Sequence, residues 1–188
     1  FFSSEKLMIN LEMKKLADCF SSLSNELTRE SDRGSVLLAV CWMDKQLTCL
    51  IQTFLIDPKG DQDTFLKTVN FSQKIQLAYR LGLIRDDTYS SLELYRRLRN
   101  EFAHLSSPLT FKTTSVKGRV LDIFRLNKKV LQSVHDVAPG HIFPSETKPN
   151  DEIEALCSLL GDRKVFDICA ALTVAGLLLT STQVEKLQ

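Results

Sequence analysis

Apolar residues recur at steps of three and four along most of the chain, and this spacing strongly restricts its fold. It is clearest in one segment, where the apolar positions are Val36, Val40, Met43, Leu47, Leu50, Ile51 and Phe54. Such steps place side chains on one face of an α-helix, whereas strands need strict alternation. Strand patterns are scarce, so the sequence predicts an all-α bundle. A chain of 188 residues favours a single domain over residues 1–188.

About seven helices are predicted, with ends marked by capping residues, glycine and proline. A first helix over residues 5–20 is followed by a polar hinge, SSLSNE, at residues 21–26. Ser31 or Asp32 caps the second helix, which stops at residues 57–60, where proline and glycine occur. The other predicted helices cover residues 73–81 (after a Ser72 cap and before Gly82), 86–104, 115–132, 151–160 and 163–180, with a loop over residues 135–150.

The last predicted helix contains the longest apolar run, ICAALTVAGLLL, at residues 168–179. The run is shorter than the roughly 20 residues that span a bilayer, so we expect no membrane contact. A helix that is apolar nearly all round must be covered on every side. It is therefore either a core helix or part of a subunit interface, and the second alternative predicts a homodimer.

Five cysteines are present, and none of them forms a CxxC pair or lies near a histidine at zinc-finger spacing. They are Cys19, Cys41, Cys49, Cys157 and Cys169. Most lie among apolar residues, so we expect buried free thiols, with no disulfide, metal or cofactor. The net charge of +1 and the lack of a signal-peptide pattern predict a cytoplasmic protein without a general attraction to nucleic acid.

The segment RRLRNEFAH, at residues 96–104, has two faces when it is wound as a helix. Leu94, Tyr95, Leu98, Phe102 and Leu105 share an arc that should face the core. Arg96, Asn100 and His104 form an outward strip, flanked by Glu93, Arg97 and Glu101. The sequence therefore predicts that His104 is not a core histidine.

Two interpretations of this outward strip are open. In the first, Glu93–Arg97 and Arg97–Glu101 are ion pairs four residues apart on a solvated helix, or they fill a polar seam between helices. In the second, Arg99 and His104 are a metal-independent nucleolytic pair, with a guanidinium that stabilises phosphorane charge and an imidazole that moves protons. Because the two residues differ by about 140° around a helix, the second interpretation needs a bend, a long arginine reach or a partner chain.

Three segments together resemble the mannitol operon repressor family of bacterial transcriptional regulators. They are RESDRG at residues 29–34, FSQKIQLAYRLGLIRDDTYSSL at residues 71–92, and RRLRNEFAH. Their order and spacing agree with the family over residues 29–125, and Arg163-x-x-Phe166 suits the family's ending. The combination carries the resemblance, since each segment alone would be a weak signal.

The resemblance implies an all-helical cytoplasmic protein, not an enzyme, that represses genes for sugar-alcohol uptake. The family lacks a recognisable DNA-reading module, and this chain likewise shows no helix-turn-helix pattern and no basic arm. Protein partners are therefore expected, either a transcription factor or a sugar-transport phosphocarrier. Contact with DNA is expected to be indirect or weak.

The spacing Arg99-x4-His104 also resembles HEPN-type helical domains, some of which are ribonucleases and many of which only bind RNA. Carried over by position, the resemblances place a candidate partner- or ligand-binding site at Arg96, Arg99, Asn100 and His104. Residues from the preceding helix start, Glu30, Asp32 and Arg33, would complete the site across the helix packing. These three residues have an equally open alternative as helix-start carboxylates and an ion pair.

Overall fold

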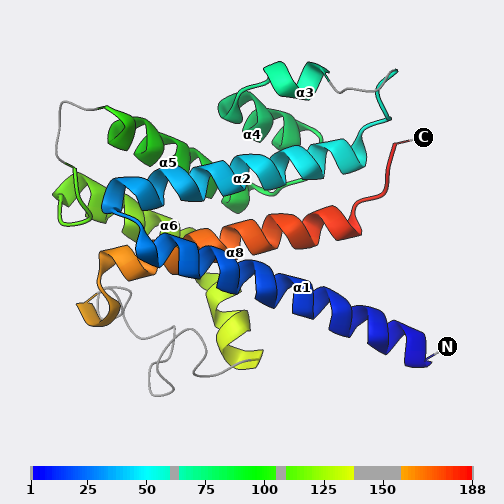
Figure 1. Cartoon of the computed structure of the whole chain (residues 1–188), viewed down its shortest axis with the longest axis horizontal. Coiled ribbons are helices and arrows are strands. Elements are labelled where there is room, and N and C mark those ends of the chain that lie inside the picture. Colours follow the sequence, from blue (N-terminus) through cyan, green and yellow to red (C-terminus); the bar gives the residue numbers. More distant parts are fainter. Residues whose placement is uncertain (1, 60–63, 105–108, 138–157, 188) are drawn as a thin grey trace.

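The computed structural model describes residues 2–59, 64–104, 109–137 and 158–187, and within these ranges the regular structure is entirely helical (Figure 1). The all-α prediction is therefore confirmed. The helices with defined bounds are α1 (Phe2–Arg29), α2 (Asp32–Phe54), α3 (Thr64–Thr68), α4 (Phe71–Arg80), α5 (Asp86–Ala103), α6 (Thr114–Val137) and α8 (Asp162–Gln183). Residues 158–160, just before α8, are helical too and bring the number of helices in the described chain to eight rather than seven.

The predicted hinge at residues 21–26 is wrong, because α1 continues without a break to Arg29. Leu23 and Leu27 are fully buried in the core, whereas Ser21, Ser22 and Asn25 are exposed on the other side of the same turns. The burial of two leucines one turn apart outweighs the weak helix propensity of serine and asparagine.

Local capping chemistry explains where several helices begin and end. Ser31 caps α2 as predicted, and its hydroxyl accepts a hydrogen bond from the Gly34 amide at 3.0 Å. Asn70, not Ser72, caps α4, because Asn70 and Gln73 exchange two side-chain to backbone hydrogen bonds at 3.0 Å. Gly82 follows α4, as predicted, and its φ of 72° is the left-handed conformation that glycine commonly adopts after a helix end.

Other boundaries differ from the prediction. The short helix α3 was not expected, and α2 ends at Phe54, before the proline-containing segment. Helix α6 runs to Val137, so that His135 is helical and the predicted loop starts later than expected. Residues 138–157, with most of that loop and of the predicted helix over residues 151–160, lie outside the described residues, as do His141 and Cys157.

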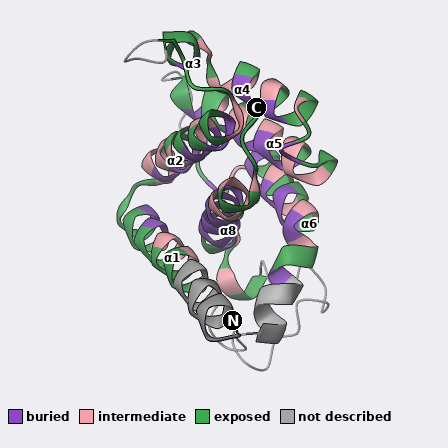
Figure 2. Ribbon diagram, turned by 90° about the vertical axis from the view of Figure 1, so that its right-hand side faces the viewer, coloured by how far each residue is buried: buried purple, intermediate pink, exposed green. Residues whose placement is uncertain are grey.

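Helix α8 lies at the centre of the bundle, surrounded by the other long helices (Figure 2). Every residue from Val165 to Ala175 is buried, and α1, α2 and α6 all pack against this helix. The single chain thus covers residues 165–175 by itself, whereas Gly176 is exposed and Leu178 and Leu179 are half-buried, so the core alternative holds for most of this helix. A homodimer does not follow from this helix.

Helices α2 and α8 are long and apolar enough to span a membrane, by length and composition alone. Half of the apolar window of α2 and 61% of that of α8 are buried inside the bundle. Core helices of bundles share this length and composition, since they too are covered by apolar side chains. The apolar stretches of α2 and α8 are thus buried to the extent expected of core helices.

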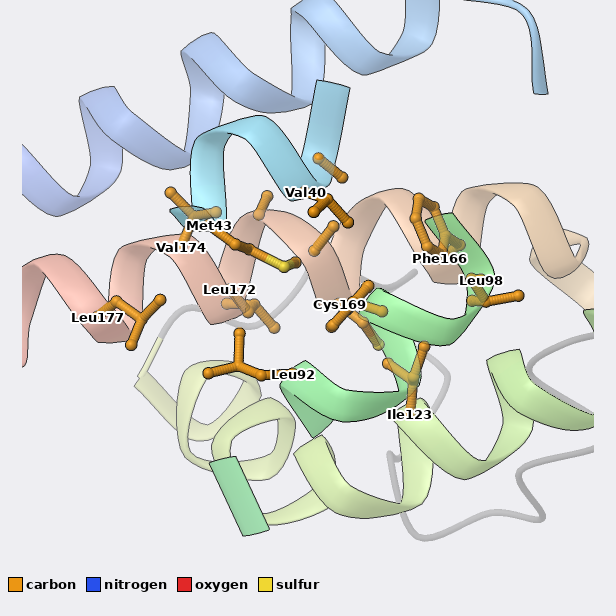
Figure 3. Packing of buried hydrophobic residues seen from close by; sticks show 14 of the residues in the cluster. Val40, Met43, Leu92, Leu98, Ile123, Phe166, Cys169, Leu172, Val174 and Leu177 are labelled. Carbon is orange, nitrogen blue, oxygen red and sulfur yellow. The ribbon is translucent and has the colours of Figure 1, made fainter. Parts of the chain in front are cut away.

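The core is one cluster to which all seven bounded helices contribute. Figure 3 shows its centre, where Phe166 and Leu172 of α8 lie among side chains of α2, α5 and α6, including Met43, Leu98 and Ile123. Each of these five side chains is at most 7% exposed. The core therefore fixes the positions of α2 and α5 relative to α8.

The prediction for the cysteines is wrong for two of them. Cys41 and Cys49 are exposed on α2, Cys19 is half-buried and Cys169 is buried in α8. None of these four cysteines forms a disulfide with another described cysteine. Cys41 and Cys49 lie among apolar neighbours in the sequence, but helical winding carries them to the solvent side of α2.

The continuous α1 predicts a strong response to truncation of Leu23. We expect Leu23→Ala to lower the free energy of unfolding by about 2–5 kcal/mol, because it leaves a cavity in a fully packed core. Ser22→Ala, at an exposed neighbouring position, should change it by less than about 0.5 kcal/mol. Urea unfolding followed by circular dichroism measures both, and equal small effects would contradict the packed helix.

Candidate functional site

The C-terminal half of α5 separates a buried face from an exposed one, as the sequence predicted. Tyr95, Leu98 and Phe102 are fully buried, whereas Asn100 and His104 are exposed. His104 caps the helix with extended backbone angles, and Leu105 lies outside the described residues. We call the set Arg96, Arg97, Arg99, Asn100 and His104 the α5 surface.

The ion pairs of α5 differ from those predicted. Glu93 pairs with Arg96 at 2.8 Å, three residues away, and Glu101 pairs with Arg119 of α6 at 2.5 Å. Arg97, the expected partner of both glutamates, is exposed and has no ion pair among the described residues. A glutamate on a helix reaches a residue three or four positions away equally well, and Glu101 faces α6, so tertiary packing decided the second pair.

Helix α2 begins beside the end of α5, so that Arg33 reaches the α5 surface. Its Nη2 donates a hydrogen bond of 3.3 Å to the backbone carbonyl oxygen of His104. This carbonyl is one of the acceptors left open at the end of a helix, where a cation is favoured. The predicted proximity of the α2 start to His104 is thus present, with the backbone of His104 as the contact.

Arg99 and His104 do not form the pair that a nucleolytic site would need. Arg99 Nη1 donates a hydrogen bond of 3.3 Å to Asn100 Oδ1, and no hydrogen bond joins Arg99 to His104 in the described part of the chain. Both side chains are exposed to solvent. The described residues also hold no group of three or more histidine, cysteine or acidic side chains that would bind a metal ion.

Asp32 has a structural role, because its carboxylate bonds to α8 and to the segment before α6. Its Oδ1 accepts a hydrogen bond from Arg163 Nη1 at 3.0 Å, and its Oδ2 accepts one from the Phe111 amide at 3.0 Å. The interpretation of Asp32 as a helix-start carboxylate in an ion pair is therefore the one that the geometry supports. Glu30 contributes its backbone, whose carbonyl accepts a hydrogen bond from Arg163 Nη2 at 3.2 Å.

Arg163, at the start of α8, connects the ends of three helices. Besides Asp32, its guanidinium donates to both carboxylate oxygens of Asp167 at 3.1 Å and to the carbonyl of Leu27 at 2.6 Å. We call Arg163 with these acceptors the Arg163 junction. The planar guanidinium presents five donors in a fixed fork, and this junction uses that fork to join α1, α2 and α8. Figure 1 shows these helix ends at one end of the bundle.

Aromatic rings extend the junction toward α5. The Arg163 guanidinium carbon lies 5.5 Å from the ring centre of Phe111, whose ring is 5.0 Å from that of Phe166 and 5.9 Å from that of Phe102. Tyr95 adds an edge contact with Phe166 at 5.6 Å. This stack fixes the buried face of α5, so its exposed face is held in a defined position.

Asp167 is nearly fully buried, and burial raises the pKa of its carboxyl above the usual value. The hydrogen bond from Ser35 at 2.7 Å and the charge of Arg163 act in the opposite direction and offset only part of this effect. Because the folded state then binds a proton more readily than the unfolded state, the contribution of Asp167 to stability falls as pH rises from about 4 through the folded pKa. Arg163 limits this loss.

Sequence reasoning noted Arg163 and Phe166 only through the family resemblance and missed Asp167 and Phe111. One signal for Asp167 was available in the sequence. A carboxylate among apolar residues needs a cationic partner, and Arg163 lies four residues before Asp167. The other hydrogen-bond acceptors of Arg163 lie more than 130 positions away in the sequence. Local patterns do not reveal such contacts.

Comparison with known proteins gives one clear similarity. No protein-family model matches the chain, and no curated protein matches it by sequence. A chain in the X-ray structure of the MtlR–HPr complex from Escherichia coli superimposes with a TM-score of 0.52 at 18% sequence identity. The match covers 88% of this chain and 99% of that chain. At this identity the similarity is one of fold.

The junction predicts a large effect of removing the Arg163 fork. We expect Arg163→Met to lower the free energy of unfolding by about 3–5 kcal/mol, because it leaves two carboxylates without their shared cation. Arg125→Met breaks an exposed pair with Asp122 and should cost less than about 1 kcal/mol. Urea unfolding at neutral pH measures both variants, and similar costs would show that the junction is not a structural centre.

Proposed function

We propose that this protein is a transcriptional regulator of the mannitol operon repressor type, a repressor or co-regulator that acts mainly through protein contacts. In this proposal it works in the cytoplasm, has no enzymatic activity or cofactor, and engages DNA weakly or indirectly. The observation that carries the proposal is the fold similarity to a chain of the MtlR–HPr complex over 99% of that chain.

The segments that resemble the family support the proposal by their positions. Residues 29–34 span the last residue of α1, the turn after it and the first three residues of α2. Residues 71–92 form α4 and the first part of α5, and residues 96–104 form the end of α5. The first of these segments supplies acceptors to the Arg163 junction, and the last carries the α5 surface. The first and third segments therefore meet where Arg33 bonds to the His104 carbonyl, whereas the second packs against the middle of α2 through the Lys74–Asp44 ion pair.

The α5 surface suits a partner with an acidic face. Arg33, Arg97 and Arg99 have no carboxylate partner among the described residues, and the last two are exposed. Unpaired guanidinium groups attract acidic surfaces and form bidentate hydrogen bonds with carboxylates. Since the similar structure is a complex with HPr, we propose a phosphocarrier protein of this kind as the partner.

The partner proposal predicts a specific dependence on the α5 surface. We expect the phosphocarrier of the same cell to bind the full chain saturably in isothermal titration, and Arg97→Glu with Arg99→Glu to weaken binding at least about tenfold, because like charges then face the partner. Arg80→Glu, at an exposed position on α4, is the matched charge reversal and should leave binding within about twofold. No saturable binding, or equal losses in both variants, would contradict the proposal.

The ribonuclease alternative from the HEPN-like spacing has a separate test. Because Arg99 bonds to Asn100 and is not joined to His104, we expect single-stranded RNA to stay intact with the protein in the presence of a chelator. His104→Ala should give the same result as the unmodified chain. Gel electrophoresis of the RNA measures both, and cleavage that His104→Ala abolishes would establish the enzyme instead.

A further inference from the structure

A cavity of about 340 Å³ lies between the start of α5, the middle of α6 and the second half of α8, away from the α5 surface. Its walls are mostly apolar and include Leu83, Ile84, Leu126, Val130, Leu172 and Leu177. Figure 3 shows Leu172 and Leu177 projecting from α8 on the side where Leu92 of α5 lies. A cavity of this size with apolar walls falls within the range of small-molecule sites.

Two buried polar residues, one from α5 and one from α6, meet at the wall of this cavity. Ser91 of α5 is 3% exposed and Asn127 of α6 is 8% exposed, and both line the cavity. Asn127 Nδ2 donates to the Ile123 carbonyl at 2.8 Å and to Ser91 Oγ at 3.3 Å. A carbonyl only accepts, so the amide nitrogen must face Ile123 and the amide oxygen must face away from it.

The remaining hydrogen-bonding capacity of these two groups forms an adjacent donor and acceptor. Asn127 Oδ1 accepts no hydrogen bond from a described residue, and the Ser91 hydroxyl donates none. Both groups can therefore bond with a molecule in the cavity that they line, since an amide oxygen and a hydroxyl each keep capacity beyond the bonds they make here. Thr173, the neighbouring buried polar residue of α8, is already satisfied, because its hydroxyl donates to the Cys169 carbonyl at 2.8 Å.

Gly176 of α8 keeps one side of the cavity open. Glycine inside a helix lowers stability relative to alanine. Gly176 has no positive φ, and a Cβ built on it would meet no atom within 4 Å. Neither the backbone nor packing requires glycine here, whereas a side chain at this position would enter the cavity that Gly176 lines.

The charges at the cavity balance one another. Arg85 and Asp87, both of which line the cavity, form an ion pair of 3.2 Å with each other. A charged ligand would therefore gain little, while the Ser91–Asn127 pair favours a neutral group that both donates and accepts. We propose that this cavity binds a small uncharged molecule with an apolar body and an amide or hydroxyl group. The apolar body lies against the leucines, and the polar group bonds with Asn127 Oδ1 and the Ser91 hydroxyl.

Benzamide is a suitable probe, because its amide donates and accepts on an uncharged ring. We expect titration of the full chain by nuclear magnetic resonance to shift the Asn127 side-chain amide signals and the neighbouring backbone signals saturably. Toluene, without a hydrogen-bonding group, and benzoate, with a charge, should each bind at least about tenfold more weakly. Equal affinities of benzamide and toluene would overturn the polar role of Ser91 and Asn127, and stronger binding of benzoate would overturn the preference for a neutral ligand.

Gly176→Leu tests the location of the site, because a Cβ at this position meets no atom within 4 Å and the rest of the new side chain would occupy the cavity that Gly176 lines. Benzamide binding should then fall at least about tenfold. Gly118→Leu is the matched control, since Gly118 is also a helical glycine with open space around it but does not line the cavity. That variant should bind benzamide as the unmodified chain does. Unchanged binding to Gly176→Leu, or no saturable shift in the unmodified chain, would overturn the proposal.

Discussion

The guanidinium of Arg163 is the interaction on which the arrangement of this bundle depends. A single side chain satisfies backbone carbonyls at the end of α1, the first carboxylate of α2 and a buried carboxylate of α8. Burying Asp167 without a cation would cost several kcal/mol, so the apolar central helix is compatible with its carboxylate only while Arg163 stays in place. This contact fixes the start of α8 against the end of α1 and the start of α2, and the apolar core holds the rest of the helix.

Helix α5 shows how the junction reaches the surface. The ring of Phe111 lies beneath the Arg163 guanidinium and contacts Phe102, which belongs to the buried face of α5. The exposed face, one half-turn away, therefore has a fixed orientation. Arg33, which lies next to Asp32 in the first turn of α2, completes this link by its contact with the His104 carbonyl. The exposed arginines of the α5 surface thus project from a helix whose buried face is held by packed aromatic rings.

Periodicity was sufficient to predict the helical class and the two faces of α5, because Leu98 and Asn100 sit where helical winding alone puts them. It failed where a distant contact decided the outcome. The polar residues 21–26 looked like a hinge because nothing nearby showed that Leu23 would be buried, and Glu101 found its cation on α6 rather than on its own helix. The structural role of Asp32 was also hidden from local patterns, because its partners Phe111 and Arg163 are far away in the sequence.

The central position of α8 has a consequence for the order in which the protein is made. Ribosomes release a chain from its N-terminus, at about 5–20 residues per second, and α1 to α6 emerge before the helix around which they pack. The earlier helices also pack against one another, but until α8 is made the apolar side chains that contact it stay uncovered. The core is therefore completed only when α8 has been synthesised. Before that, we expect chaperones that bind exposed apolar surfaces to bind the incomplete bundle.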